Sequence, residues 1–383
     1  MEKLRIFILN ASPIYGGGEY YTYQLALNLV KRGHYVIIGC RKDNLLINKC
    51  ANTGIQTEKI NFGNKGFFGL INEIKLIAKN NKINIIHTNT VEDRTTGAVA
   101  AKLTGAKHVT SCHSLLSVQR NITHYIRNKK LTNAFIADGI SVKELLVNKD
   151  KINPHRIHVI NNGIVPEEMK RNAEKRKSLR DEFGIKDDDI IIGCTARLVY
   201  FKGHKYLLNA FEILFDKNKS AKLMIVGDGE LMNELIEYSR ILKISDRIIF
   251  TGFRDDLQNL YSAFDIYAHP SVSGGGELFP YSVLYAMAQG LPVAATSIGD
   301  MPYMVKDHRS GFIVKERSAV ELSDKLDLLI NDRALREKFG KEAYSRFINN
   351  FTIEQTIDKT EKLYYDILVG LFPRKRESIS GNI

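Results

Sequence analysis

The chain has 383 residues, 44% of them hydrophobic and 26% charged, which predicts a soluble globular protein with two domains of ordinary size. No apolar run reaches the ~18 residues that a membrane-spanning helix needs, and the start, MEKLRIFILNASP, has too short an apolar core for a signal peptide. The net charge of +12 lies in the first half: residues 1–170 hold 24 Lys/Arg and 12 Asp/Glu, whereas residues 171–383 hold 31 of each.

The first part of the chain alternates short β-branched runs with helical periodicity, as in YYTYQLALNLVKRG, where Gly33 ends the helix. This alternation is typical of a parallel, doubly wound sheet. The predicted strands are residues 5–10, 35–40, 83–88, 106–112, 134–138 and 156–160.

The segment 165–189 is charged, contains no predicted strand and suits a connection between domains. After it the alternation resumes, so the fold class is α/β with two tandem Rossmann-like domains, and the cleft between them is the expected ligand site. The predicted strands of the second domain are residues 190–196, 222–227, 247–252, 265–270, 291–296 and 311–314. The predicted boundaries are 1–165, 166–355, a helix at 356–372 that returns to the first domain, and a disordered tail at 373–383.

The four cysteines have no CxxC spacing, which predicts reduced thiols in a cytoplasmic protein, without a zinc site or a disulfide. The basic first domain would attract anionic partners: nucleic acid, an anionic membrane or an anionic substrate. A generally basic proteome is the alternative without functional meaning. Basic residues interleaved with aromatic ones, as on nucleic-acid-binding surfaces, are not found.

Three glycines, Gly16 to Gly18, follow the first strand and precede the first helix, where backbone N–H groups can approach a phosphate. Glu19 and Tyr21 stand where the dinucleotide fingerprint G-x-G-x-x-G needs glycine, which argues against a nicotinamide or flavin protein. A tight turn between strand and helix is the structural alternative.

Two cations, Arg197 and Lys202, follow the first strand of the second domain, and Gly203 then opens a helix. Such a pair can neutralise a diphosphate. The glycine turn VGDGE (226–230) also follows a strand, but Asp228 has no second carboxylate at metal-binding spacing, so no protein-bound metal is predicted.

The stretch GGGELFP, residues 274–280, places Glu277 just before Pro280, which suits the first turn of a helix. The positive end of that helix would point to the same place as Arg197 and Lys202, and Glu277 could accept hydrogen bonds from sugar hydroxyls. A helix-capping carboxylate is the commoner role. His113, at the end of a first-domain strand, is either structural or a sugar contact.

Together these motifs resemble the retaining glycosyltransferases of the GT-B fold, the large bacterial family 4 type that includes lipopolysaccharide and phosphatidylinositol glycosyltransferases. The resemblance covers about residues 4–370. The motifs occur in family order: GG at 16–17, the histidine at 113, NNG at 161–163, RLxxxKG at 197–203, VGDG at 226–229, FTGF at 250–253, HPS at 269–271 and AMAQGLPVAAT at 286–296.

The resemblance implies catalytic roles at four positions. Arg197 and Lys202 would hold the leaving diphosphate in place of a metal, Glu277 would hold hydroxyls of the donor sugar, and His113 would lie near the reacting carbon. The loop at Phe253 and Arg254 would meet the base. The donor-binding positions would be Gly16, Gly17, Gly227, Phe253, Leu278, Phe279 and Tyr285.

Tyr285 departs from the family, because it stands at the second glutamate of the E-x7-E motif that begins at Glu277. That glutamate usually contacts ribose hydroxyls. Tyrosine keeps one hydroxyl that can donate and accept, and losing a charge-assisted hydrogen bond costs roughly 1.5–3 kcal/mol. The expectation is an active enzyme with altered nucleotide handling.

The resemblance implies transfer of a hexose or related sugar, with retention and without a metal or cofactor, from a UDP- or GDP-sugar substrate to a glycan or lipid-linked acceptor in cell-envelope polysaccharide synthesis. A non-catalytic nucleotide-sugar-binding protein and a sugar-nucleotide epimerase are the alternatives.

Segment 114–131 is expected to form an amphipathic helix that rests on the inner face of an anionic cell membrane, and an ordinary core-facing helix is the alternative. Its apolar face would be Leu115, Val118, Ile122, Tyr125 and Ile126, accompanied by Arg120, Arg127, Lys129 and Lys130.

Overall fold

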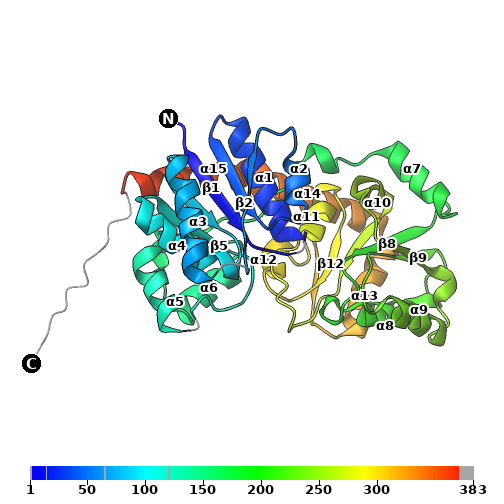
Figure 1. The fold of residues 1–383 in the computed structure, drawn as a ribbon. Helices are drawn as coiled ribbons and strands as arrows, with labels where there is room; N and C mark the ends of the chain where they lie inside the picture. The colour runs from blue at the N-terminus through cyan, green and yellow to red at the C-terminus, as the bar shows by residue number, and fades with distance from the viewer. Residues whose placement is uncertain (1, 14, 64–65, 120, 371–383) are drawn as a thin grey trace, which may run out of the picture. The chain divides into compact units, whose positions relative to one another are not determined.

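The computed structural model describes residues 2–13, 15–63, 66–119 and 121–370. The described chain divides into two compact units, each built on one parallel sheet (Figure 1). Unit 1 comprises the residues up to Asp138, Val142–Ile160 and the residues from Ile357 onward, and unit 2 comprises Gly139–Ser141 and Asn161–Thr356. The predicted tail at 373–383 lies outside the described residues.

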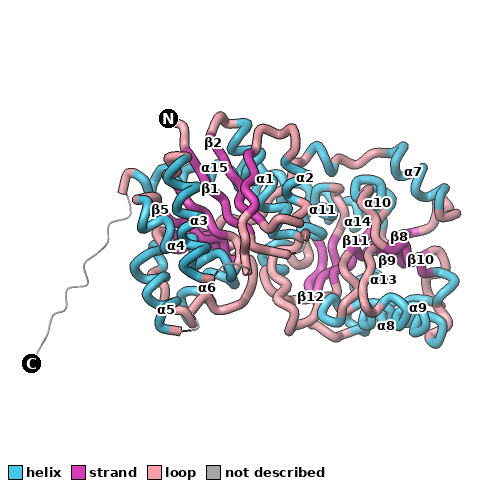
Figure 2. Tube along the Cα trace, viewed as in Figure 1, coloured by secondary structure: helices cyan, strands magenta, loops and turns pink. Residues whose placement is uncertain are grey.

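Unit 1 holds a seven-stranded sheet in the order β3-β2-β1-β4-β5-β6-β7. All neighbouring strands run parallel, so their carboxyl ends meet at one edge. Figure 2 shows the strands in magenta between the cyan helices. The strands are β1 (Arg5–Asn10), β2 (Tyr35–Cys40), β3 (Gln56–Lys59), β4 (Ile85–Thr88), β5 (Lys107–Cys112), β6 (Ala134–Ala137) and β7 (Ile157–Val159).

Strand β3 is the one strand of unit 1 that the sequence pattern did not predict. Its residues, QTEK, carry no apolar side chain, and two of the four are exposed. An edge strand pairs along one side only, here with β2, so backbone hydrogen bonds rather than burial define it. Hydrophobic periodicity therefore carries no signal for this strand.

Helices connect the strands of unit 1, and a buried apolar cluster fills the space between the sheet and helices α3 and α4. Phe7 and Leu9 of β1 belong to this cluster together with Leu70 and Ile74 of α3. The helices are α1 (Gly17–Lys31), α2 (Leu46–Cys50), α3 (Phe67–Asn80), α4 (Val91–Thr104), α5 (Ile122–Ile126), η1 (Arg127–Leu131), α6 (Ile140–Asn148) and η2 (Pro154–Arg156).

The last helix, α15 (Ile353–Leu368), returns to unit 1 as predicted. Its Tyr364 hydroxyl lies 2.6 Å from Nδ1 of His87 in β4, and its Glu361 accepts from Nε2 of His34 at 2.7 Å. Burial lowers the pKa of His87 to about 3, so this contact joins two neutral groups at physiological pH. The helix is thus fixed to the sheet by polar contacts as well as by packing.

Unit 2 holds a six-stranded parallel sheet in the order β10-β9-β8-β11-β12-β13. Its strands are β8 (Ile190–Thr195), β9 (Ala221–Val226), β10 (Ile248–Gly252), β11 (Ile266–His269), β12 (Val293–Thr296) and β13 (Gly311–Val314). Every one of the six was predicted from its buried, β-branched or small-residue run, to within two residues at each end.

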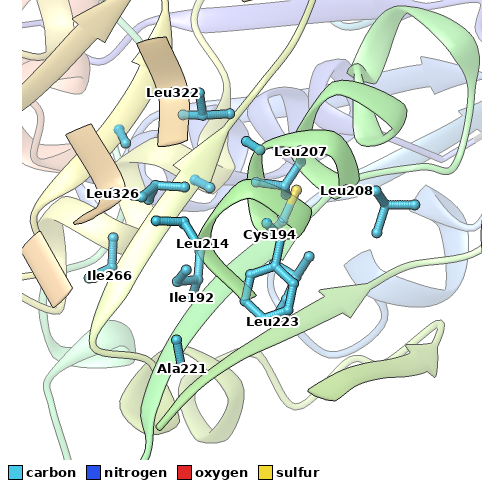
Figure 3. Packing of buried hydrophobic residues seen from close by; sticks show 14 of the residues in the cluster. Ile192, Cys194, Leu207, Leu208, Leu214, Ala221, Leu223, Ile266, Leu322 and Leu326 are labelled. Carbon is cyan, nitrogen blue, oxygen red and sulfur yellow. The ribbon is translucent and has the colours of Figure 1, made fainter. Parts of the chain in front are cut away.

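A second buried cluster lies between this sheet and helices α8 and α13 (Figure 3). Leu207 and Leu214 of α8 and Leu326 of α13 pack there against Ile192 of β8 and Ile266 of β11. The helices and helical turns of this part of the chain are η3 (Glu167–Met169), α7 (Ala173–Glu182), η4 (Tyr200–Lys202), α8 (His204–Phe215), α9 (Met232–Ile241), η5 (Ser245–Arg247), α10 (Leu257–Ala263), α11 (Tyr281–Ala288), α12 (Met301–Met304), α13 (Ala319–Asn331) and α14 (Arg333–Asn350).

The expected amphipathic helix at 114–131 is shorter than the periodicity predicted. Among the described residues of this segment only α5 is α-helical, and it continues into the π-helical turn η1. Val118 is buried, which removes it from the expected apolar face, and Arg127 is buried as well. The Arg127 guanidinium donates to Val118 O and Thr95 Oγ1, so it folds this segment instead of meeting solvent. Arg120 lies outside the described residues.

All four cysteines are buried, with free thiols. None of the helices in the described part of the chain combines the length and the apolar character needed to cross a bilayer.

Candidate active site

The order of the unit 2 sheet reverses between β8 and β11, which is the switch point where open parallel sheets bind ligands beyond their carboxyl ends. Two loops leave the sheet at this point. One follows β8 and carries Arg197 and Lys202, and the other follows β11 and carries Glu277. The topology thus places the three predicted unit 2 catalytic residues at one edge.

Lys202 and Glu277 form an ion pair between the two loops. Their side chains are 16% and 8% exposed, so the pair is largely withdrawn from water. The same Glu277 oxygen, Oε2, accepts from Ser271 Oγ at 3.0 Å and lies 3.4 Å from Nε2 of His269. Burial alone would raise the pKa of Glu277, but His269 and the Lys202 ammonium hold it well below its ordinary value. Glu277 is therefore an anion at neutral pH.

Gly203 allows the two loops to approach each other. Its φ of +72° belongs to the left-handed region, and a Cβ at this position would overlap the carbonyl oxygen of Pro270. The helix α8 that follows begins at His204, so the glycine both turns the chain into the helix and brings Lys202 to the β11 loop.

Arg197 is exposed, and its guanidinium has no ion pair or hydrogen bond with the described residues. The backbone of the loop that carries Arg197 is nevertheless held by hydrogen bonds. Leu198 N donates to Asp228 O at 2.9 Å, and Leu231 N donates to Leu198 O at 3.0 Å, which ties this loop to the one after β9. Arg197 is thus an unneutralised cation on a rigid loop.

Helix α11 begins just after Glu277, with Pro280 as its N-cap. The side chains of Leu278 and Phe279 are buried, and their backbone N–H groups donate to no atom in the described part of the chain. Unpaired amides at the positive end of a helix bind anions. The sequence left two roles open for Glu277, binding of sugar hydroxyls and capping of the helix. Its side chain does not cap helix α11 but pairs with Lys202.

The predicted base-binding loop follows β10. Phe253 is 78% exposed, whereas Arg254 is held by Glu182 and by both oxygens of Asp256 at 2.7 Å. Gly227, after the neighbouring β9, donates its N–H to Gly252 O at 2.9 Å. Phe253 is thus exposed and open to a ligand, whereas Arg254 is engaged in contacts that hold the loop.

Tyr285 lies one helical turn into α11, partly buried. Its ring packs edge-on against Tyr261 with centroids 5.7 Å apart and lies 6.3 Å from Tyr281. Tyr261 in turn contacts Thr195 Oγ1 at the end of β8. The tyrosine therefore belongs to an aromatic cluster at the same edge as the ion pair.

Sequence reasoning gave no role to His269, Ser271 or Phe201, which all lie at this edge. The HPS motif at 269–271 was the available signal for the first two, because it ends a strand beside the switch point. Phe201 gave no signal, since its contact is with a residue 74 positions further along the chain, Gly275.

The unit 1 sheet has its switch point between β1 and β4. Gly16 and Gly17 lie there at the start of α1, and Gly16 N donates to the Glu19 carboxylate at 2.8 Å. Asp93, fully buried in the first turn of α4, accepts from Ala11 N at 3.1 Å and from the backbone and hydroxyl of Thr90. It thus ties the ends of β1 and β4 together below the glycine loop.

Burial raises the pKa of Asp93 from 3.8 to about 7, against the opposing hydrogen bonds from Thr90. Between these two pKa values the folded chain binds more protons than the unfolded chain, so stability falls as pH rises through this window and levels off above it. The limiting slope is about 1.4 kcal/mol per pH unit. We expect Asp93→Asn to remove this loss between pH 5 and pH 8 in urea unfolding, and Asp43→Asn, at an exposed position, to retain it. An unchanged pH dependence in Asp93→Asn would contradict the assignment.

His113 follows β5, and its Nδ1 lies 3.5 Å from the buried carboxylate of Asp138 at the end of β6. The edge of its ring contacts Tyr21 of α1, with centroids 4.8 Å apart. Its Nε2 has no hydrogen-bond partner in the described part of the chain. His113 is thus oriented by two neighbours and retains one free nitrogen.

No group of three or more His, Cys, Asp or Glu side chains within the described residues is arranged to hold a metal ion. Arg197 and Lys202 supply positive charge at the switch point of unit 2.

Comparison with known proteins supplies a family for this geometry. Residues 149–346 match the family described as glycosyl transferases group 1, and residues 15–168 match glycosyltransferase family 4. An Escherichia coli protein named UDP-Gal:alpha-D-GlcNAc-diphosphoundecaprenol alpha-1,3-galactosyltransferase is 26% identical over 318 residues, which span 80% of this chain and 81% of that protein.

Two solved structures share the fold. The Anabaena protein HepE in complex with UDP has a TM-score of 0.85 at 21% identity, over 95% of this chain and 100% of that chain. A glycosyltransferase from Rickettsia africae has a TM-score of 0.88 at 25% identity, over 97% and 100% of the two chains.

Proposed function

Since the chain belongs to the glycosyl transferases group 1 family, with the GT-B fold that its sequence predicted, we propose that it transfers a sugar from a nucleotide-sugar donor to a glycan or lipid-linked acceptor. The match to the Escherichia coli galactosyltransferase, named for a UDP-sugar and a diphosphoundecaprenol acceptor, favours a UDP-sugar and a lipid-linked glycan of the cell envelope. Retention of anomeric configuration and independence of metals and cofactors are part of the proposal.

The observation that carries this proposal is the cluster at the unit 2 switch point. An unpaired cation, Arg197, shares the edge with the Lys202–Glu277 pair and with unpaired amides before α11. Cations and amides suit the two charges of a diphosphate, and a buried, ionised carboxylate suits sugar hydroxyls. A nucleotide sugar presents both groups side by side.

In the proposed reaction the bond between the anomeric carbon and the diphosphate oxygen breaks, and the electron pair leaves with the diphosphate. Arg197, Lys202 and the amides of Leu278 and Phe279 stabilise that leaving charge, which is the electrostatic term that dominates such reactions. The acceptor hydroxyl attacks the same face of the sugar, and its proton passes to the departing phosphate oxygen. His113 Nε2 would contact the sugar near the reacting carbon.

Tyr285 would lie in the ribose subsite, where the family carries a glutamate. The aromatic contacts with Tyr261 and Tyr281 hold its ring. In the proposed transferase, replacing the glutamate would lower nucleoside affinity more than the rate of bond breaking. Phe253 offers an exposed face for the base. A protein that binds the nucleotide sugar without transfer is the second candidate, and Tyr285 is the observation that favours it.

A panel of UDP-, GDP-, ADP- and CMP-sugars tests the donor assignment by thermal shift, followed by product analysis with a lipid-linked acceptor. We expect one nucleotide class to raise Tm and to be turned over, with the anomeric configuration kept in the product by NMR. Stabilisation without turnover would favour the binding protein, and no shift at millimolar concentration would overturn both candidates. An inverted product would refute retention alone.

We also propose that unit 1 contacts an anionic membrane through α5 and the loop before it. Leu116, Ile122 and Ile126 are exposed there, and Lys129 and Lys130 are exposed at the turn η1. Apolar side chains beside lysines fit the boundary between headgroups and acyl chains. The excess of Lys and Arg in residues 1–170 also favours contact between unit 1 and an anionic membrane.

Vesicle flotation tests this contact. We expect the protein to float with vesicles that contain anionic lipid, and to do so several-fold less with neutral ones or after Ile122→Ser. Ile122 is 70% exposed, and Ile241 in unit 2, 67% exposed, gives the matched control Ile241→Ser, which should float like the wild type. Equal loss in both variants would contradict a specific surface.

A further inference from the structure

The two loops at the unit 2 switch point interlock around the side chain of Phe201. Phe201 O accepts from Val272 N at 2.8 Å, which joins the loop after β8 to the loop after β11. The Phe201 ring lies against Gly275, where any Cβ would overlap it. The Lys202 ammonium lies 5.4 Å from the centroid of the same ring.

The three glycines of this loop are glycine for different reasons. Gly274 and Gly276 have φ values of +104° and +75°, which side chains rarely adopt, and a Cβ at either would meet open space. Gly275 is absent from the positive-φ residues, so its backbone would accept another residue. The atoms nearest to a Cβ at Gly275 all belong to the side chain of Phe201, which therefore excludes a side chain there.

The loop is anchored at its other end by Glu316, which follows β13. Ser273 donates to Glu316 Oε2 from both its backbone N–H, at 2.7 Å, and its hydroxyl, at 2.9 Å. Between this anchor and Glu277 the chain has only the three glycines, which are the most flexible residues available. Within the glycine run, the contact of Gly275 with Phe201 therefore limits where Glu277 lies relative to Lys202, in addition to the contacts of Glu277 with Ser271 and His269.

We propose that Phe201 is a positioning residue for sugar transfer: its ring supports Gly275 and so holds Glu277 beside Lys202, in the geometry that receives the donor. The proposal rests on the proposed function, because it assigns the catalytic role to Lys202 and Glu277 and a supporting role to Phe201. It differs from a simple packing role, since the loop that Phe201 supports ends in the carboxylate that would bind the sugar.

A double-mutant cycle between positions 201 and 275 tests this. Gly275→Ala in the wild type should displace the loop and lower kcat/KM for the nucleotide sugar by about 100-fold, the loss expected for a misplacement near 1 Å. In the Phe201→Gly background the added methyl group has room, so Gly275→Ala should cost less than about fivefold there. Phe201→Gly by itself should lower kcat/KM at least tenfold.

The control for added backbone flexibility is Tyr200→Gly, which alters the same helical turn at an exposed side chain. It should keep kcat/KM within about twofold of the wild type. Tm is measured for every variant, so that effects on activity can be separated from effects on stability. A positioning role requires that the coupling between the substitutions at 201 and 275 is larger in kcat/KM than in stability.

Two results would overturn the proposal while the wild type remains active: independent effects of the two substitutions on kcat/KM, or coupling in Tm with unchanged kinetics. A wild type that transfers no sugar from any nucleotide would instead refute the proposed function, and with it the role given to Phe201.

Discussion

Lys202→Met is expected to lower kcat by about 10²–10³-fold and to destabilise unit 2 at the same time. The kinetic loss follows from removing one charge that stabilises the leaving diphosphate. The stability loss, about 3 kcal/mol, follows because Glu277 would remain buried and ionised without its ammonium partner. Steady-state kinetics and urea unfolding measure the two effects.

The chain offers a matched control for the stability effect. Lys222 pairs with Asp189 at 2.9 Å, with side-chain exposures of 22% and 9%, beside the amino ends of β8 and β9. Lys222→Met should therefore lose stability in the same way and keep its activity. The double variant Lys202→Met/Glu277→Gln should regain stability, because no buried charge is left alone, and remain inactive. An active double variant would contradict the proposed role of Lys202.

Arg197→Ala should produce the opposite combination, a loss of about 10²–10³-fold in kcat/KM with Tm changed by no more than about 2 °C. The reason is that the Arg197 guanidinium is exposed and makes no ion pair within the described chain, so the folded protein does not depend on it. Arg197→Lys should recover only part of the activity, since a lysine cannot hold two phosphate oxygens with a planar fork.

Arg309 gives the control for charge alone, because it is exposed in the turn before β13, at the amino edge of the same sheet. Arg309→Ala should leave both kcat/KM and nucleotide binding unchanged. Equal losses in the two alanine variants would mean that net charge, and not the position of Arg197, decides donor binding. A normal rate in Arg197→Ala would remove it from the proposed site.

The sequence indicated the fold through features that are local. Six of seven strands in unit 1 and all six in unit 2 carry runs of apolar or small residues, because a parallel sheet is covered on both faces. Strand β3 was missed because an exposed edge strand needs no apolar run, unlike strands that are covered on both faces. The prediction of one amphipathic helix at 114–131 was wrong because Val118 and Arg127 are buried. Their tertiary contacts do not show in the hydrophobic periodicity of the sequence.

By itself, the sequence determined which residues follow the carboxyl ends of the strands, and so which chemistry gathers at each sheet edge: cations after β8, a carboxylate and glycines after β11, a histidine after β5. Only the tertiary structure decided that Lys202 pairs with Glu277, that Arg197 stays free while Arg254 is held, and that Phe201 explains Gly275. The order of residues along the chain determines which of them follow each strand. Contacts between residues about 75 positions apart depend instead on how the loops pack.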